Sequence, residues 1–469
     1  MATTITQKPL YTTLPVGQDV IFTLTNTASV NAYFNVKFIA EVYISQTSPS
    51  TTTVDLIGTF KTTPNTALVG IFDFSAVVEN HVKADNLATS ALGISQYKTV
   101  PVTADRVPPI HLVDKFALNE NAMKYLIIKF SMEGSTTATG IPAFITGSEA
   151  QSVTYKIFNG YLKETNKLEI GLLLTAPNDF GLNIGVGSDT NIQLTDSNSS
   201  FLSNAPTTQY ANIDDYGTLG ILCPIRIDDF TRVRFTYYDS TGSTLGNEDV
   251  FTYLTTSSNL WLHLLYVGCF PANLRGWSTI FQGLVTAGTI QGGYYTVEAK
   301  DVVSSLSQIY TIHVNCPDLK NYEPIRLCWL NQWGAWDYYT FTKKSSRTLS
   351  TQGTTYTQLE GTWNESAFRL NGYRGGKKAF RVNATEKIKM NTDFVNESES
   401  EWFEELINSP EVYMLEGFQT DNSFAMLNTY ITPVRLTTSS YTRKTIANDR
   451  LMQYTFEVEK SKTLRTQAV

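Results

Sequence analysis

The sequence contains few of the residues that usually carry chemistry. Only four histidines are present, and no two of them lie at the spacing of a metal site or an acid–base pair. A nucleophile elbow, a phosphate-binding P-loop and a dinucleotide-binding fingerprint are all missing. We therefore expect no enzyme, no catalytic residue, no cofactor and no metal. We interpret the histidines as structural: His81, His111, His263 and His313.

Cysteines and long apolar runs are also scarce. The four cysteines stand far apart and form no Cys-x-x-Cys pair, so neither a zinc site nor a disulfide framework is predicted. The longest apolar run, residues 261–270, is about half of a membrane span. The first residues lack the basic and apolar segments of a secretory leader. These absences predict a soluble protein, made in a cytoplasm and without membrane insertion.

Charged residues make up only 17% of the chain, and the net charge is -7. Because phosphate backbones are bound by basic surfaces, this balance argues against a nucleic-acid partner. One stretch is locally basic, where four cations surround the glycines of a turn that could hold an anion. A solvated loop is the favoured interpretation, since runs of charge usually face water. The candidate basic loop comprises Arg374, Lys377, Lys378 and Arg381.

Threonine, serine, asparagine and aromatic residues are abundant instead, and aromatic residues alone make up 12% of the chain. β-Branched and aromatic side chains fit a pleated sheet, whereas serine and asparagine compete with the backbone for hydrogen bonds inside helices. The composition therefore predicts a mostly all-β fold, with several β-sandwich or antiparallel-sheet domains in tandem.

At 469 residues the chain is too long for a single ordinary core, and strand patterns divide it into three predicted parts. Residues 1–115 form an N-terminal β-sandwich. Residues 116–320 form one or more central β domains with a long polar loop at residues 183–200. Residues 321–469 form a C-terminal β domain with an aromatic hairpin and one short, capped helix.

The clearest strand of the first part covers residues 34–44. Its apolar side chains, from Phe34 to Ile44, alternate with polar ones in the two-residue period of a strand. A single apolar face predicts an antiparallel sheet that is packed on one side. Residues 54–60 supply the next strand, so the two form a hairpin with a long tip at residues 46–53.

The one predicted helix lies near residues 399–408. Ser398 and Glu401 form a capping box, in which the hydroxyl accepts from the Glu401 amide and the carboxylate reaches back. An apolar stripe follows on one face, and Ser409-Pro410 ends the helix. The stripe consists of Trp402, Phe403, Leu406 and Ile407.

The stretch 326–341 gathers three of the seven tryptophans around a turn signal. Alternation on both sides of Gly334 predicts a β-hairpin with an aromatic face. Aromatic side chains bury about 150 to 250 Å² each, so the hairpin can anchor a core or a subunit interface. Sugar stacking on Trp333 and Trp336 is the alternative. The candidate interface or stacking residues are Trp329, Trp333, Trp336, Tyr338 and Tyr339.

Charged residues elsewhere admit a sharper and a plainer interpretation. Arg232 and Arg234 lie on one face of a predicted strand, where a solvent-facing side is favoured over a contact face for an acidic partner.

The Asp and Asn residues at 189–198 could bind calcium through their oxygens, but they lack the ligand order of a calcium loop, so a solvated loop is favoured. A glycosidase needs two carboxylates about 5 to 9.5 Å apart, but adjacent strand residues point to opposite faces. The adjacent acids are Asp214-Asp215, Asp228-Asp229 and Glu404-Glu405, the last of which we interpret as the polar side of the predicted helix.

Several segments of the chain are distinctive. They are Lys37-Phe38-Ile39-Ala40-Glu41-Val42-Tyr43, Pro64-Asn65 with Gly70-Ile71-Phe72-Asp73-Phe74-Ser75, Phe201-Leu202-Ser203-Asn204-Ala205-Pro206 with Gly217-Thr218-Leu219, and Arg326-Leu327-Cys328-Trp329-Leu330-Asn331-Gln332-Trp333-Gly334 with Trp336-Asp337-Tyr338-Tyr339. On these segments the chain resembles β-rich structural proteins of tailed bacteriophage virions, of the marine or crAss-like type. The resemblance extends over most of the chain, and the aromatic hairpin is its most specific element.

The resemblance implies a component of the virion neck or tail, such as a ring, hub, muzzle or fibre-adaptor protein, that acts by assembly. It implies a symmetric homo-oligomer in contact with other virion tail and neck proteins, with a host surface glycan as a further candidate partner. It carries over no functional residue. Two alternatives stay open: a carbohydrate-binding adhesin or receptor-binding module, and a tail-associated glycan-degrading enzyme.

Overall fold

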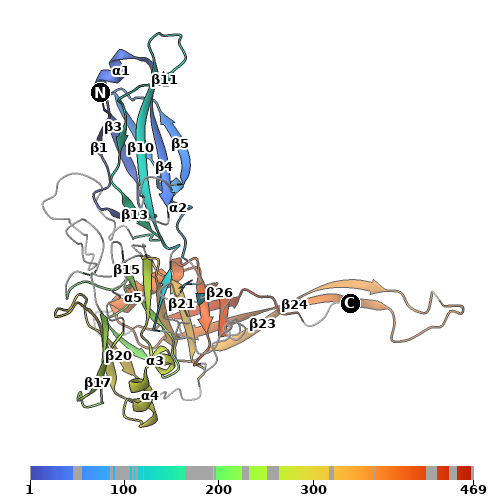
Figure 1. Cartoon of the computed structure of the whole chain (residues 1–469). Coiled ribbons are helices and arrows are strands. Elements are labelled where there is room, and N and C mark those ends of the chain that lie inside the picture. Colours follow the sequence, from blue (N-terminus) through green and yellow to red (C-terminus); the bar gives the residue numbers. More distant parts are fainter. Residues whose placement is uncertain are drawn as a thin grey trace. The chain divides into compact units, whose positions relative to one another are not determined.

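The computed structural model describes residues 2–45, 55–84, 88–89, 106–107, 110, 115–119, 121–163, 194, 197–223, 232–250, 263–315, 322–363, 365–418, 430–442 and 452–465. Strands predominate over short helices among these residues, which confirms the mostly β fold (Figure 1). No helix among them combines the length and the apolar character that a membrane span requires. The predicted loops at 46–53 and, for the most part, 183–200 lie outside the described residues.

The chain divides into two compact units. The first comprises Met1–Pro317, Leu330–Asp337 and Gly417–Met426, and the second comprises Asp318–Trp329, Tyr338–Glu416 and Leu427–Val469. The predicted parts 1–115 and 116–320 thus fall within one unit, except for residues 318–320. The turn of the aromatic hairpin belongs to that first unit, although the rest of the hairpin belongs to the second.

A β-sandwich forms the N-terminal part of the first unit. Its elements are β1 (Thr4–Gln7), β2 (Thr13–Pro15), β3 (Ile21–Thr25), α1 (Thr27–Ala32), β4 (Phe34–Ser45), β5 (Leu56–Thr62), β6 (Val69–Asp73), α2 (Ser75–Glu79), β10 (Met123–Ser135), β11 (Ala143–Phe144), β12 (Ala150–Gln151) and β13 (Tyr155–Phe158). One sheet has the order β1-β3-β6; the other has the order β2-β13-β10-β4-β5, with β11 and β12 paired to β10. Phe22 of β3 joins them, with ring centroids 5.6 Å from Phe130 and 5.7 Å from Tyr155.

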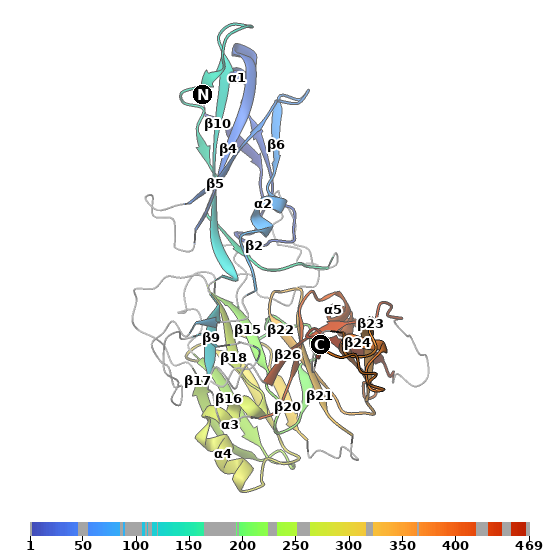
Figure 2. The same ribbon diagram turned by 90° about the vertical axis from the view of Figure 1, so that its right-hand side faces the viewer.

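The sandwich extends beyond residue 115, its predicted end, because strand β10 belongs to it. This strand pairs antiparallel with β4 from Tyr125↔Ser45 to Ser135↔Phe34, and the two strands lie side by side in Figure 2. On its other edge β4 pairs with β5, which confirms the predicted hairpin. The alternating apolar face is buried as expected from Val36 to Ile44, whereas Phe34 remains 51% exposed. The sandwich therefore includes residues that the sequence patterns assign to the central part.

Two five-stranded sheets and two helices follow in the first unit. They are built from β7 (Ala88–Thr89), β8 (Arg106–Val107), β9 (Phe116–Asn119), β14 (Thr208–Ala211), β15 (Thr218–Cys223), β16 (Arg232–Tyr238), β17 (Thr244–Val250), β18 (His263–Gly268), α3 (Pro271–Trp277), α4 (Thr279–Thr286), β19 (Tyr294–Lys300) and β20 (Tyr310–Val314). The sheet orders are β14-β20-β19-β16-β17 and β15-β18-β9-β7-β8. Their shared core includes Phe235, Leu265 and Phe281.

The prediction of a single helix was wrong, because α1, α2, α3 and α4 are also present. Pro271 occupies the start of α3, where a missing N–H is tolerated. Ser278 ends α3 and caps α4, because its hydroxyl accepts from the Phe281 amide at 2.9 Å. The residues of α4 include β-branched types and a glycine, which have modest helix propensity. Burial of Phe281 in the core favours the helix despite that propensity.

One seven-stranded sheet, most of it in the second unit, carries the aromatic hairpin at one end. Its elements, with the helix that covers it, are β21 (Ile325–Leu330), β22 (Trp336–Phe341), β23 (Ser346–Gln358), β24 (Gly376–Asn391), α5 (Glu397–Asn408), β25 (Val412–Leu415), β26 (Ile431–Leu436) and β27 (Thr455–Lys460). The strand order is β22-β21-β25-β26-β27-β24-β23. The two hairpins β21–β22 and β23–β24 therefore form opposite ends of the sheet.

Helix α5 packs an apolar stripe on this sheet. Trp402 lies 4.9 Å from Trp329, and Phe403 lies 5.4 Å from Phe456, between ring centroids. The helix ends before Ser409, as predicted, but its capping box begins two residues earlier than expected. Asn396 Oδ1 accepts from the Glu399 amide at 2.8 Å, and Glu399 Oε2 accepts from the Asn396 amide at 2.8 Å. Asn396 and Ser398 are both good N-cap types, and the sequence alone does not choose between them.

Candidate assembly interface

The feature of the second unit that most suggests a function is a long two-stranded ribbon. Strands β23 and β24 pair antiparallel over thirteen residue pairs, from Ser346↔Lys389 to Gln358↔Gly376. Only the base of β24 has a further partner strand, β27, which pairs with Lys387–Asn391. Farther out, the single additional contact between described backbones is the bridge Ala384↔Leu464. Figure 1 shows the two strands running out together past the sheet.

The sequence explains why these residues are extended. Residues 348–357 are rich in threonine, a β-branched residue that favours strands. At the far end, Gly375 and Gly376 have φ values of 99° and 78°, which only glycine adopts without strain. A turn precedes them, since the Arg374 amide donates to the Asn371 carbonyl at 2.9 Å.

Almost no side chain of the ribbon is buried. Ten successive residues of β23 are exposed, and β24 becomes buried only at its base, at Ile388 and Met390. A two-stranded hairpin without a third layer is marginally stable in water. The ribbon is therefore the kind of element that gains stability when another surface covers it.

The ribbon ends in an exposed apolar tip, residues 359–375, which we call the arm tip. Five large side chains there leave more than half of their surface in solvent: Leu359 (72%), Trp363 (68%), Phe368 (56%), Leu370 (70%) and Tyr373 (73%). Trp363 and Phe368 pack on each other, with ring centroids 5.0 Å apart. Exposed apolar groups in such a cluster are typical of interaction sites.

Hydrogen bonds within the arm tip fix its shape. Trp363 Nε1 donates to the Glu360 carbonyl at 2.6 Å. The hydroxyl of Thr362 accepts from the Arg369 amide at 2.8 Å and donates to the Ala367 carbonyl at 3.1 Å. A preformed loop loses less conformational entropy when it binds, so these bonds favour binding with the exposed rings already in place.

The predicted basic loop is part of this ribbon. Arg374 lies in the arm tip, whereas Lys377, Lys378 and Arg381 lie on strand β24, which corrects the loop interpretation. Lys378 Nζ donates to the carbonyl of Tyr373 at 3.0 Å, and the Arg374 guanidinium lies 5.8 Å from the Tyr373 ring. None of the four cations forms an ion pair with a carboxylate in the part of the chain that the structure describes. Their charge is available to a partner.

The base of the ribbon differs, because its charges are paired within the chain. Arg347 contacts Glu323 at 2.5 Å and Glu386 at 2.8 Å, and Lys460 contacts Glu386 at 2.7 Å. The hydrogen bonds from Lys460 and Arg347 lower the pKa of Glu386. The bonds to Glu323 and Glu386 raise the pKa of Arg347. This network anchors the ribbon to the sheet.

The aromatic hairpin itself is an interior element. Trp329, Trp333, Trp336 and Tyr338 are at most 4% exposed, and Tyr339 is half-buried. The four buried rings leave no open face for a sugar or for a neighbouring subunit. The sequence offered a core or an interface for these residues, and the structure places them in the core.

Asn331 holds the turn of this hairpin. Its Oδ1 accepts from the amides of Trp333 and Ala335, both at 3.0 Å, and its Nδ2 donates to the Leu202 carbonyl at 2.8 Å. Trp333 Nε1 in turn donates to Asn204 Oδ1 at 3.2 Å. The polar groups of the turn are thus satisfied inside the first unit, as burial requires.

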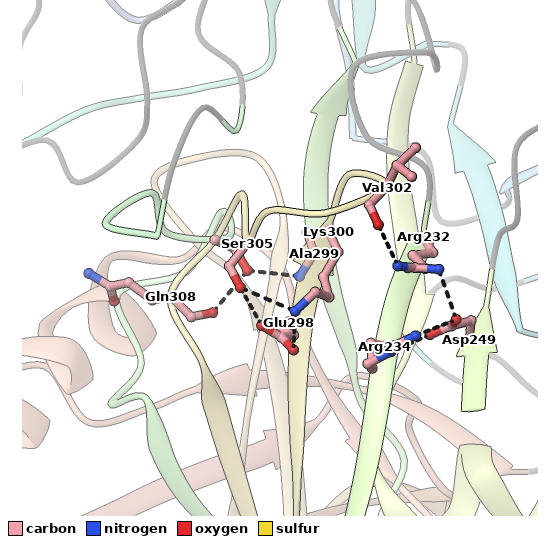
Figure 3. A network of polar contacts seen from close by, with 10 residues as sticks. Arg232, Arg234, Asp249, Glu298, Ala299, Lys300, Val302, Ser305 and Gln308 are labelled. Carbon is pink, nitrogen blue, oxygen red and sulfur yellow. Dashed lines mark hydrogen bonds and ion pairs between the residues drawn. The ribbon is translucent and has the colours of Figure 1, made fainter. Parts of the chain in front are cut away.

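Strand β16 carries two arginines whose acidic partner belongs to the same chain. Figure 3 shows Arg234, which donates to both carboxylate oxygens of Asp249 at 2.8 and 2.9 Å, and Arg232, 3.4 Å from the same carboxylate. The hydrogen bonds from Arg234 lower the pKa of Asp249. On β19, Lys300 contacts Glu298 at 3.1 Å. The network stabilises the sheet surface and needs no external acidic partner.

The candidate acids do not converge. Asp214 pairs with Arg275, and the buried Asp215 accepts from the Asn212 amide at 2.8 Å. Glu404 and Glu405 lie on α5, but Glu405 is buried, so the interpretation of the pair as the polar side of the helix was wrong for that residue. Asp228-Asp229 lies outside the described residues, as do most of residues 189–198. Within the described ranges, no group of three or more His, Cys, Asp or Glu side chains is placed to hold a metal ion.

Sequence reasoning missed the arm tip. The signals were present: a threonine-rich run followed by Trp363, Phe368 and Tyr373 among glycines. They were overlooked because the run has no clean alternation of apolar and polar residues. The chain matches no protein-family model and no curated protein, so a function has to be argued from the ribbon itself.

Proposed function

We propose that the protein is a structural subunit that acts by assembly, as a neck or tail component of a tailed-phage virion. The ribbon is its principal contact element. The observation that carries this proposal is the arm tip, where five large apolar side chains lie exposed at the end of two strands that no described residue covers as a further layer. The virion context comes from the resemblance of the sequence.

Energetic reasoning supports assembly over a free-standing role. Burial of apolar surface contributes roughly 25 cal/mol per Å² removed from water. Trp, Tyr and Arg are the residue types that most often dominate binding energy at interfaces, and the arm tip presents Trp363, Tyr373 and Arg374 together. Exposure of this set in an isolated subunit is a cost that a partner surface removes.

Incorporation into particles tests this proposal. The full chain, expressed with the other structural proteins of a tailed phage, is expected to co-sediment with particles. The Trp363→Ala/Tyr373→Ala variant should lose most of that incorporation. The matched control is Val302→Ala/Val303→Ala, which alters another exposed apolar pair, 70% and 83% exposed, and should incorporate normally. A chain that stays a compact monomer and never sediments with particles would show that the proposal is wrong.

A carbohydrate-binding module is the second candidate, and Trp363 is the observation that favours it. Among the tryptophans that the structure describes, Trp363 alone is exposed. An aromatic ring of this kind can stack on a sugar. Host polysaccharide would then quench the tryptophan fluorescence, and Trp363→Ala would abolish the quenching. Release of reducing ends from the polysaccharide would instead indicate the tail-associated glycan-degrading enzyme and exclude a module that only binds carbohydrate.

A further inference from the structure

We infer that the arm tip docks on the acidic body of a second copy of this chain, so that each copy gives one arm and receives another. This inference rests on the proposed function and names its partner. The length of the ribbon allows the arm tip to reach another copy. Its positive charge favours an acidic surface, and its exposed aromatic rings provide apolar area for binding.

The reach follows from strand geometry. Thirteen paired residues at about 3.4 Å each extend the ribbon by roughly 40 Å from its first pair to its last. The first pairs, beside β27, belong to the sheet; the last pairs have no neighbouring strand among the described residues. The arm tip is therefore presented well away from the sheet in which the ribbon is anchored.

The charge distribution favours contact between the arm of one copy and the rest of another copy, which we call its body, over contact between two arms. The outer ribbon, residues 351–384, contains five Lys or Arg and two Glu, a net charge of +3. The whole chain carries -7, so the remainder carries -10. Residues 116–320 alone contain eleven Lys or Arg and eighteen Asp or Glu. An arm is thus attracted to an acidic body and repelled by another basic arm.

The cations that would make this contact are free to do so. Arg369, Arg374, Lys377, Lys378 and Arg381 have no ion-pair partner among the described carboxylates. At the base of the ribbon, by contrast, Arg347 and Lys460 are held by Glu323 and Glu386. Within the described ranges, the charges that anchor the ribbon are neutralised and those of the outer ribbon form no ion pair.

An arm-to-body contact is heterologous, since two different surfaces meet. Repetition of such a contact closes a ring when the rotation between copies allows it. This geometry fits a neck or tail component with cyclic symmetry. An anionic lipid surface would also attract exposed rings beside cations, but the acidic remainder of the chain opposes that attraction.

Self-association of the purified full chain tests the inference. Sedimentation equilibrium should show oligomers at low salt that dissociate as salt is raised, because exposed charges are screened. Lys377→Glu/Lys378→Glu should raise the dissociation constant at least tenfold, and Trp363→Ala/Tyr373→Ala should leave monomers. Leu349→Ser is the matched control, because this exposed apolar side chain lies at the base of the ribbon, outside the arm tip, and the variant should behave like the unaltered chain. Circular dichroism should be unchanged in all variants, because the altered side chains are exposed.

A photo-crosslinking amino acid in place of Trp363 separates the possible partners. Crosslinks to residues outside 346–391 of a second copy are expected. Crosslinks to a second arm tip would overturn the inference. A monomer at every concentration that sediments with phosphatidylserine vesicles would overturn it in favour of a lipid surface. A monomer that nevertheless incorporates into particles would overturn self-docking and leave the virion role standing, whereas a monomer that does neither contradicts both.

Discussion

Two consecutive hairpins of this chain carry aromatic side chains and lie in opposite environments. The β21–β22 hairpin encloses Trp329, Trp333 and Trp336 in the interior, whereas the β23–β24 ribbon presents Trp363 and Tyr373 to solvent. Both belong to one seven-stranded sheet, and they form its two ends. Aromatic content and hairpin geometry therefore do not by themselves decide which hairpin is buried.

The difference lies in what each hairpin receives from elsewhere in the chain. Helix α5 places Trp402 against Trp329, and Asn331 satisfies the turn through three hydrogen bonds. The outer ribbon receives no such layer among the described residues, and its turn is held by local bonds such as that of Thr362 to the Arg369 amide. One hairpin is completed by other elements of its own chain, whereas the other receives no covering layer from the described residues.

The largest expected contrast is between two tryptophan truncations. Trp329→Ala removes a fully buried indole from beneath α5 and should destabilise the second unit by about 3 to 5 kcal/mol. Trp363→Ala removes an exposed indole and should change the stability of the monomer by less than about 0.5 kcal/mol. Urea unfolding followed by far-UV circular dichroism measures both. Equal losses would mean that the two hairpins are not energetically different.

A glycine pair gives the next largest contrast. Gly334 has a φ of 74°, and a Cβ there would collide with the Asn159 carbonyl oxygen. Gly334→Ala should therefore cost more than about 2 kcal/mol, from backbone strain and from the clash. Gly372 is the control, because a Cβ at that position would meet nothing within 4 Å. Gly372→Ala should be neutral or slightly stabilising, and a comparable loss at both positions would contradict the assigned turn.

Sequence patterns correctly predicted the strands and helices in which apolar residues recur at a regular spacing. The strand at residues 34–44 was correct, because one-sided burial imposes an alternation of two residues. The helical stripe was correct at Trp402, Phe403 and Leu406, whereas Ile407 is only half-buried. The aromatic hairpin was predicted for the same reason. Its burial was left as one of two possibilities, because the answer depends on a helix some sixty residues later in the chain.

The arm tip could not be predicted in that way. Residues 346–358 alternate poorly because both faces of the ribbon meet solvent, so no period marks them as a strand. The basic residues were noticed, but the glycines beside them indicated a loop; Gly376 instead begins β24. What makes the site a candidate is the lack of a third strand beside it, which is a property of the sheet and not of any short stretch.

The pH dependence of stability should differ between variants at the base of the ribbon and variants in its outer part. The pKa of Glu386 in the folded chain lies below its ordinary value of 4.5. Its ionised form therefore stabilises the fold above about pH 4.5, and that contribution is lost as pH falls through the lowered pKa. Allowing for solvent screening, Glu386→Gln should cost about 1 kcal/mol at pH 7 and progressively less in acid. Urea midpoints from pH 7 to pH 3 measure this. Arg381→Gln is the control, and its difference from the unaltered chain should stay near zero and not vary with pH.

The smallest effect is spectroscopic and tests the exposure of the arm tip without altering stability. Trp363 is 68% exposed, whereas Trp329, Trp333, Trp336 and Trp402 are at most 3% exposed. Acrylamide should quench an accessible fraction of the emission, and Trp363→Phe should remove most of that fraction while the unfolding midpoint stays the same. Trp277 is half-buried and Trp261 lies outside the described residues, so Trp277→Phe and Trp261→Phe are measured beside it to determine their shares. If acrylamide quenches the Trp363→Phe variant as strongly as the unaltered chain, the arm tip is covered by its own chain, and the contrast between the two hairpins disappears.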